Sequence, residues 1–148
     1  MNYKHGQAKT ATYESWCAMK RRCCDKNYRN WKYWGGRGIT VCHLWKTFVN
    51  FFADMGERPK GLSLDRIDTN GNYEPNNCRW VTHTQQVRNT RIYKTNTSGA
   101  KGVCWFKDRR KWHSYISVNS KIINLGYFET IAQAAAARQA GVLKYWLF

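Results

Sequence analysis

The sequence predicts an α+β fold made of two small modules. In the first module, residues 63–82 alternate like a strand, are interrupted by Gly71 and Pro75, and resume an extended pattern before a run of good helix formers. In the second module, residues 101–148, three short strand-like runs precede an alanine-rich helix. Strands and helices that are segregated in this way, without βαβ alternation, are typical of the α+β class.

The charge of the chain predicts a polyanionic partner. Its 148 residues include 25 Lys and Arg against 9 Asp and Glu, which gives a formal net charge of +16 and a pI near 9.9. The hydrophobic fraction of 43% is sufficient for folded cores, which excludes a disordered chain. Because no leader-like segment or long apolar run is visible, we expect a soluble cytoplasmic protein that does not bind membranes.

The residues before these strands predict two helices. A three-to-four spacing of apolar residues indicates a helix from Thr12, which can act as its own N-cap. An aromatic and glycine-rich loop follows at residues 27–38. Residues 39–42 are expected to form a short strand, and residues 43–55 a helix whose aromatic stripe is core and whose C-cap is Gly56.

The cysteines predict free thiols. No two of them form the Cys-x-x-Cys knuckle that zinc sites commonly use, and nothing indicates an oxidising compartment. We therefore expect buried thiols that pack as small hydrophobes. A zinc site built from some of Cys23, Cys42 and His5 is the alternative. The six cysteines are Cys17, Cys23, Cys24, Cys42, Cys78 and Cys104.

Seven segments between residues 5 and 91 resemble, in order and spacing, a family of phage HNH (ββα-metal) endonucleases. These segments are HG, YESWCAMKRRC, GGRGITVC, FADMGERPKG, SLDRID, GNYEPNNCRW and TQQVRN. The resemblance implies an HNH nuclease core with N-terminal helices over residues 1–90. It also implies a metal-dependent endonuclease of the homing-endonuclease kind, which hydrolyses phosphodiester bonds in double-stranded DNA within the bacterial host of a phage.

The same resemblance assigns roles to three residues of the first module, and helix periodicity adds a fourth. Asp65 is expected to be the metal ligand on the first strand, Asn77 the brace of the loop, and Gln86 the ligand on the helix. Asn89 lies one turn after Gln86 on the same helix face and can help or replace it. Oxygen and amide ligands suit hard cations, so Mg²⁺ or Mn²⁺ is expected and zinc is disfavoured.

Arg66 departs from the family pattern, which has the general-base histidine at this position. A guanidinium stays protonated at neutral pH, so Arg66 can clamp a phosphate or stabilise developing charge but cannot accept a proton from water. Variant ββα-metal nucleases that pair Asp with Arg are similar in this respect. Another side chain must then be the base, and the sequence leaves five candidates open: His5, His43, His83, Tyr33 and Tyr73.

Residues 91–100 are polar, basic and small, and predict a linker. Beyond it, strands are expected at residues 102–106, 112–118 and 122–128, followed by a helix from Ile131 to about Lys144. The run KGVCWFKDRRKWHSYISVNSKIINLGYFET, followed by AAAARQAGVLKYW, resembles the DNA-binding domain of plant ethylene-response factors (the APETALA family). That resemblance implies a three-stranded antiparallel sheet, packed on one helix, that holds the target duplex.

Strand alternation predicts one sheet face against the helix and one exposed face. Trp105 and Trp112 are expected on the helix face, in the core. Arginines are missing from the strand centres, so the exposed face should read few guanines and depend on phosphate contacts at the turns. The DNA-contacting residues expected in the chain are Arg37, Lys94, Lys101, Lys107, Arg109, Arg110, Lys111, His113, Tyr115, Ser117, Lys121 and Asn124.

Other functions stay open at this stage. The main alternative is a DNA-binding or regulatory protein that kept the HNH fold and lost its base, which Arg66 favours. An inhibitor of another nuclease or polymerase has only the charge in its favour, and no protein partner is evident. RNA binding is disfavoured because neither resembled module is an RNA reader. The sequence does not distinguish nicking from double-strand cleavage, although a monomer with one metal site favours nicking.

Overall fold

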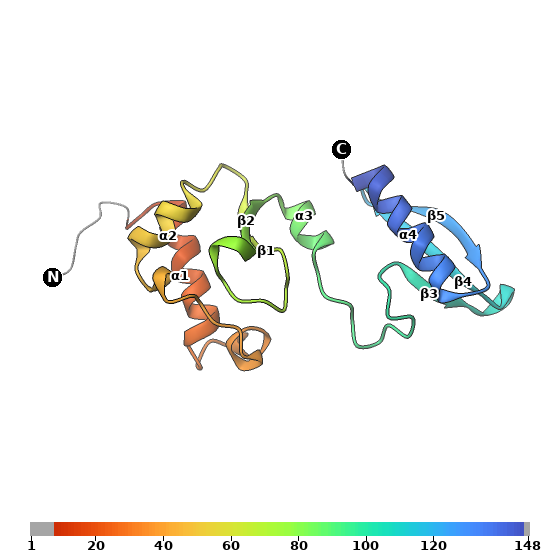
Figure 1. Ribbon diagram of the computed structural model, residues 1–148, viewed down its shortest axis with the longest axis horizontal. Coiled ribbons are helices and arrows are strands. Elements are labelled where there is room, and N and C mark those ends of the chain that lie inside the picture. Colours follow the sequence, from red (N-terminus) through yellow and green to blue (C-terminus); the bar gives the residue numbers. More distant parts are fainter. Residues whose placement is uncertain (1–7, 147–148) are drawn as a thin grey trace. The chain divides into compact units, whose positions relative to one another are not determined.

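The computed structural model describes residues 8–146, which divide after Thr90 into two compact units (Figure 1). The described residues have a mixed α+β structure with four α-helices and two small antiparallel sheets. This confirms the predicted α+β class. None of the helices among these residues is long and apolar enough to cross a membrane.

Helix α1 (Ala11–Cys24) begins the first unit, and its N-cap is Thr10, so the prediction of Thr12 was wrong. The Thr10 hydroxyl accepts a hydrogen bond from the Tyr13 amide at 3.2 Å. Thr12 is 1% exposed, and its hydroxyl accepts a hydrogen bond from the Arg58 amide at 2.8 Å. The local pattern alone would use the Thr12 hydroxyl as a helix cap. In the folded chain this hydroxyl is instead bonded to the amide of Arg58, which is distant in sequence.

The predicted helix over residues 43–55 is shorter than expected. Thr47 has an extended backbone (φ −101°, ψ 142°), which separates a 3₁₀ turn from helix α2 (Phe48–Met55). The Asn50 side chain donates to the Leu44 carbonyl at 3.0 Å, which satisfies an acceptor that a continuous helix would have paired with a backbone amide. Gly56 is the C-cap, as predicted.

The strand expected at residues 39–42 is also wrong. These residues form a single parallel bridge, Val41 with Tyr73, and no ladder. The Thr40 amide donates to the side chain of Asn72 at 2.9 Å, and Tyr73 and Cys42 continue the contact through their backbones. Since residues 71–73 are a loop and not a strand, they offer too little extended backbone to pair with a longer segment.

The core of the first unit forms around Trp45 and Phe51, which are both 0% exposed and meet edge to face at 5.0 Å. The Trp45 indole donates to the Asp54 carboxylate at 2.6 Å, so the polar atom of the buried ring is paired. Trp80 donates to the Met55 carbonyl at 2.7 Å. This last bond fastens the hairpin that carries the candidate site to the end of α2.

That hairpin pairs β1 (Ser63–Arg66) with β2 (Cys78–Val81) in antiparallel register, and helix α3 (His83–Arg88) follows directly. The hydroxyl of Thr82 accepts a hydrogen bond from the Gln85 amide, while the Gln85 side chain returns to the Thr82 amide at 2.9 Å. This capping box starts α3 one residue after the strand ends. The predicted order of strand, loop, strand and helix is therefore confirmed.

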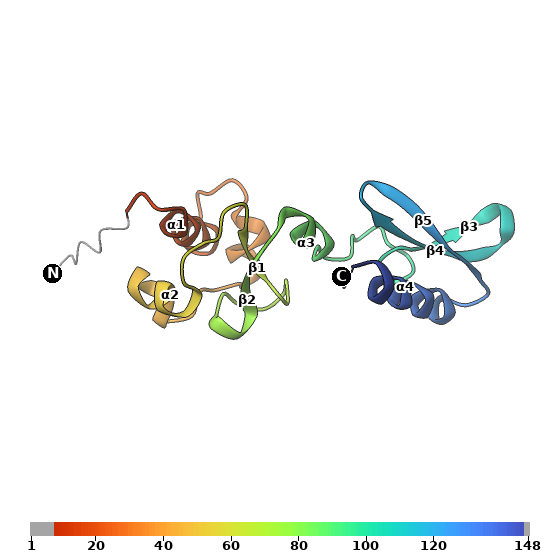
Figure 2. The same cartoon turned by 90° about the horizontal axis from the view of Figure 1, so that it is seen from above.

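The second unit is a three-stranded antiparallel sheet in the order β3-β4-β5, with α4 along one face (Figures 1 and 2). Its elements are β3 (Val103–Phe106), β4 (Lys111–Val118), β5 (Lys121–Phe128) and α4 (Ile131–Trp146). The sequence predicts each of their bounds within two residues. Small side chains on α4 allow close packing: a Cβ added at Gly141 would lie 2.8 Å from a methyl group of Leu125.

Trp105 is not in the core of the second unit, and this prediction was wrong. Its side chain is 43% exposed and meets the half-buried Trp112 at a ring distance of 5.2 Å. Alternation does place Trp105 on the same face as the buried Val103. However, β3 is an edge strand, and α4 packs mainly on β4 and β5. The helix therefore does not cover the far end of β3.

Part of the segment predicted as a linker folds onto the second unit. The Ser98 side chain is 9% exposed and donates to the Val103 carbonyl at 2.8 Å. Asn96 donates to the Ala100 carbonyl at 3.0 Å, which closes a turn before β3. Residues 96–100 are thus an ordered entry to the sheet, and sequence alone missed this because the segment has no hydrophobic period.

Substitution of Gly102 by alanine is expected to destabilise the second unit by about 2 kcal/mol or more, because strain and a steric clash add. Gly102 has φ +69°, and an added Cβ would lie 2.5 Å from the Tyr115 carbonyl oxygen. Gly99→Ala is the matched control, since Gly99 has the same φ but open space around it, and it should cost only about 1 kcal/mol. Hydrogen exchange of the β4 amides measures both, and equal costs would contradict this packing.

The six cysteines are free thiols, but the prediction that they are buried is wrong for half of them. Cys78 is buried and Cys23 and Cys42 are half-buried, whereas the other three are exposed on α1 and β3. Burial raises the pKa of the Cys78 thiol to about 12 and that of Cys23 to about 11. The folded chain therefore keeps these two thiols protonated at alkaline pH, where an unperturbed thiol ionises.

An alkylating reagent at pH 8 is expected to modify three thiols quickly and Cys78 and Cys23 only on unfolding, because thiolates are the reactive form. The fast set is Cys17, Cys24 and Cys104. Mass spectrometry of alkylated peptides tests the predicted order of thiol reactivity, and rapid labelling of Cys78 in the native chain would contradict it.

The raised pKa values of Cys23 and Cys78 make the free energy of unfolding fall as pH rises above about 9, since the unfolded chain then releases protons that the folded chain retains.

Candidate functional site

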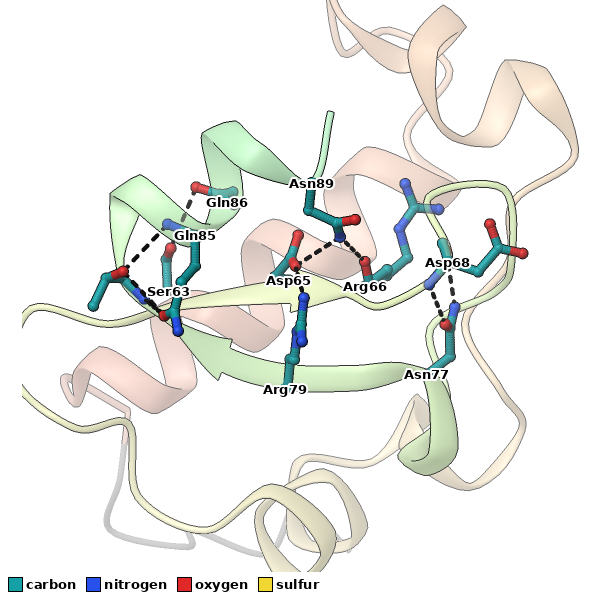
Figure 3. A network of polar contacts seen from close by, with 10 residues as sticks. Ser63, Asp65, Arg66, Asp68, Asn77, Arg79, Gln85, Gln86 and Asn89 are labelled. Atoms are coloured by element: carbon teal, nitrogen blue, oxygen red, sulfur yellow. Dashed lines mark hydrogen bonds and ion pairs between the residues drawn. The ribbon is translucent and has the colours of Figure 1, made fainter. Parts of the chain in front are cut away.

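Asp65 is the centre of the candidate site, on the last part of β1 and beside the end of α3 (Figure 3). Asp65 is 8% exposed, so its carboxylate lies largely out of water. A buried carboxylate is stable only when other groups compensate its charge. Two side chains do so here, one from α3 and one from β2.

The first is Asn89, the C-cap residue of α3, whose amide nitrogen donates to Asp65 Oδ2 at 2.9 Å. The same nitrogen also donates to the Arg66 carbonyl, which fixes the plane of the amide. The second is Arg79, whose guanidinium lies 3.6 Å from the same oxygen, Oδ2. The register of the hairpin explains this pair, because Asp65 and Arg79 are directly opposite each other.

Gln86 does not join this group. Its side-chain oxygen accepts a hydrogen bond from the Ser63 hydroxyl at 3.3 Å, two residues back along β1 from Asp65 (Figure 3). The helix places Asn89, one turn later, against the carboxylate instead. Of the two helix residues that the sequence singles out, Asn89 is therefore the partner of Asp65.

Asn77 holds the loop between the two strands. Its side-chain oxygen accepts from the Asp68 amide at 2.8 Å, and its nitrogen donates to the carbonyls of Asp68 and Asn72 at 3.1 and 2.8 Å. A Cβ at Gly71 would lie 2.6 Å from that nitrogen, so glycine is what lets the loop close over Asn77. The loop that begins after Arg66 is thus fixed from inside.

Arg66 is 8% exposed and is part of the same loop. Its guanidinium donates to the Gly71 carbonyl at 2.9 Å and lies over the Tyr73 ring at 4.8 Å. Tyr73 is itself 2% exposed, and its hydroxyl accepts from Arg22 at 3.5 Å. The guanidinium that replaces the expected histidine therefore stabilises the loop from beneath.

Of the five candidate bases, the four that lie within the described residues differ in burial. Burial raises the pKa of the Tyr73 phenol, which makes Tyr73 unsuitable as a base near neutral pH. His43, His83 and Tyr33 are exposed, and within residues 8–146 none of them makes a hydrogen bond to Asp65. His5 lies outside the described residues.

The zinc alternative gains no support from the described part of the chain. His5, one of its three proposed ligands, lies outside that part. Within residues 8–146, no group of three or more His, Cys, Asp or Glu side chains is placed to hold a metal ion.

The chain is similar to a phage protein over part of its length. The chain is 36% identical over 70 residues to "Protein 3.8" of Escherichia phage T7. The match covers 47% of this chain and 58% of that protein, so the chain spans a little over half of the relative's length. No family model matches the chain, and no solved structure matches it. The relative's name states no activity, so the functional argument depends on the residues themselves.

Arg37, the one residue of the first unit expected to contact DNA, holds the β1–β2 loop. Its guanidinium donates to the Asn70 side chain at 2.6 Å and to the Thr69 carbonyl at 3.4 Å. The loop that Asn77 closes from inside is thus also held from outside by residue 37. Whether Arg37 reaches DNA as well stays a prediction.

All the other residues expected to contact DNA lie in the second unit. Arg109 lies over the ring of Tyr127 at 4.4 Å, and that ring stacks on His113 at 4.8 Å. Tyr115 continues the stack at 5.4 Å from His113. The sheet face opposite α4 therefore carries a row of rings with one arginine at its end. The exposed residues of the expected set are Lys94, Lys107, Arg109, Arg110, Ser117, Lys121 and Asn124, and the half-buried ones are Lys101, Lys111, His113 and Tyr115.

Sequence reasoning missed Arg79. The facing residues of two paired strands can be read from sequence only where a short loop joins the strands and fixes their register. The loop of residues 67–77 is too long for that register to be read from sequence. The structure supplies it, and it places Arg79 at the carboxylate.

Proposed function

We propose that the chain is a metal-dependent DNA endonuclease whose cation site is formed by Asp65 and Asn89. The observation that carries this proposal is the contact between a buried strand carboxylate and the amide of a helix that follows the hairpin. The net charge of +16 supports a nucleic-acid partner. The match to a phage protein supports a phage origin, and the bacterial cytoplasm as the place of action.

The donor set fits Mg²⁺ or Mn²⁺. Mg²⁺ in phosphate-processing sites is usually held by one or two carboxylates, with waters and substrate phosphate completing the octahedron. Asp65 supplies the carboxylate. A half-turn of the Asn89 amide about its last side-chain bond would exchange its nitrogen for its oxygen at the same place, without backbone movement. When bound, such a cation stabilises negative charge on a phosphate and lowers the pKa of water.

The residues of the chain divide the remaining work. Asn77 and Arg66 keep the loop closed, so that the end of β1 and the Asp65 carboxylate stay in place. Arg66 is not the base, because its guanidinium is both permanently charged and engaged with Gly71 and Tyr73. The proton of the attacking water must then pass to an exposed group or to solvent. A monomer with one such metal site would favour single-strand nicking.

Cleavage of a supercoiled plasmid tests this proposal. The full chain with Mg²⁺ is expected to convert supercoiled to nicked plasmid, and EDTA or the substitution Asp65→Ala should abolish the conversion. Glu57→Ala is the matched control, because Glu57 is an exposed acid of the same unit and is outside the site. Nicking by Asp65→Ala at the wild-type rate would show that the activity comes from elsewhere.

Duplex binding without cleavage is the second candidate function, and the placement of Arg66 favours it. A histidine at this position would be a base, whereas Arg66 serves the loop. In that case the chain would retain a labelled duplex in a salt-dependent manner, but no nick would appear with Mg²⁺ or Mn²⁺. The plasmid assay and a binding assay on the same preparation separate the two functions.

A further inference from the structure

We propose that Arg79 occupies the cation position in the free chain and moves from Asp65 to a DNA phosphate when the cation binds. This inference rests on the proposed function and extends it, because it assigns a positioning role to a residue outside the expected site. It begins from the cross-strand pair in which Asp65 and Arg79 face each other with 3.6 Å between guanidinium nitrogen and carboxylate oxygen.

The two partners differ in their access to solvent. The Asp65 side chain is 9% exposed, whereas the Arg79 side chain is 47% exposed. A buried carboxylate needs its charge compensated, so Arg79 stabilises Asp65 as long as no metal is present. The Arg79 side chain is about half in solvent, so moving its guanidinium away from Asp65 leaves no buried positive charge.

Competition follows from a shared atom. The Asn89 amide nitrogen and the Arg79 guanidinium both contact Oδ2 of Asp65. A divalent cation bound to this oxygen would repel the adjacent guanidinium and would remove the reason for its position. Of the cations within residues 8–146, Arg79 is the one that pairs with Asp65, and the adjacent Arg66 is held by Gly71 and Tyr73.

The released guanidinium would lie beside the place where a cation-bound phosphate must be. Arginine binds phosphate oxygens through paired N–H groups, and this geometry suits it better than lysine. Cation and DNA should then help each other to bind, because each favours the displaced position of Arg79. In the absence of cation, Arg79 contributes little to DNA binding, since its charge is offset by Asp65.

Mn²⁺ titration of the full chain, followed by the loss of the free-ion paramagnetic resonance signal, tests the competition. Arg79→Ala is expected to bind Mn²⁺ about two- to fivefold more tightly than wild type, the range that a half-exposed ion pair accounts for. Arg79→Lys keeps the charge and should stay close to wild type. Lys60→Ala removes the same charge from an exposed position of the same unit and should change nothing.

Duplex binding tests the second part of the proposal, that Arg79 moves to a DNA phosphate when the cation binds. With Ca²⁺ as a hard cation and a short labelled duplex checked for integrity, the wild type should bind more tightly than in EDTA. Arg79→Ala should lose most of this gain but match wild type in EDTA. Equal Mn²⁺ affinity of Arg79→Ala and wild type, or an undiminished Ca²⁺ effect, overturns the inference while the metal site stands. If wild type binds no Mn²⁺, or Asp65→Ala binds it equally well, the proposed metal site and this inference both fail.

Discussion

Asn89→Ala is expected to lower the rate of plasmid nicking by about 10²-fold, the size of effect that loss of one metal-positioning or charge-stabilising group produces. Asn89 contacts the Asp65 carboxylate at 2.9 Å. Gln86→Ala is the matched control, because Gln86 lies one turn earlier on the same face of α3 but bonds to Ser63. We expect less than about a threefold change from Gln86→Ala, since a surface hydrogen bond of this length is weak.

The same two variants separate a chemical effect from a folding effect. Asn89 also bonds to the Arg66 backbone, so its loss can loosen the hairpin. Thermal unfolding and Mn²⁺ titration of both variants should therefore accompany the rates. A folded Asn89→Ala that keeps wild-type Mn²⁺ affinity, together with a Gln86→Ala that loses it, would reverse our assignment of the helix ligand.

Arg66→Ala is expected to destabilise the first unit by about 2–4 kcal/mol, because two contacts of a buried side chain are lost and the Gly71 carbonyl loses its partner. These contacts are the hydrogen bond to the Gly71 carbonyl and the stacking on Tyr73. Hydrogen exchange of the β1 and β2 amides, measured as a function of urea concentration, gives the free energy of unfolding of this unit alone.

Arg79→Ala is the control for Arg66→Ala, since it removes an arginine from the same hairpin. Its side chain is 47% exposed and makes one long ion pair, so a cost below about 1 kcal/mol is expected. Arg66→His should also destabilise the loop. It should not increase nicking, because the histidine would enter the space between Gly71 and Tyr73. A stable and more active Arg66→His would show that this side chain faces the substrate.

Much of the fold could be predicted from sequence, because local signals were strong where the outcome was local. Alternation and turn residues predicted the hairpin, and the run of good helix formers after it predicted the helix that follows. The strands and helix of the second unit followed from β-branched and aromatic runs. These signals failed where a distant contact decided the conformation, as at Thr12, whose hydroxyl the Arg58 amide takes.

The candidate site could be predicted only in part. The resemblance to HNH endonucleases pointed to Asp65 and Gln86, and helix periodicity added Asn89, but the sequence could not choose between Gln86 and Asn89. That choice depends on how the hairpin sets the rotation of a six-residue helix about its axis. Arg79 was missed because a loop of eleven residues leaves the strand register open. The role of Arg66 was missed because its partners, Gly71 and Tyr73, are brought to it only by the folded loop.

A crystal of the full chain grown or soaked with Mn²⁺ tests the central claim, that Asp65 and Asn89 form a cation site, most directly. The predicted result is an anomalous-scattering peak within about 2.5 Å of a carboxylate oxygen of Asp65, with the side-chain oxygen of Asn89 turned toward it and Gln86 still on Ser63. A fully occupied peak elsewhere in the chain, or none at Asp65 in the presence of excess Mn²⁺, would contradict it.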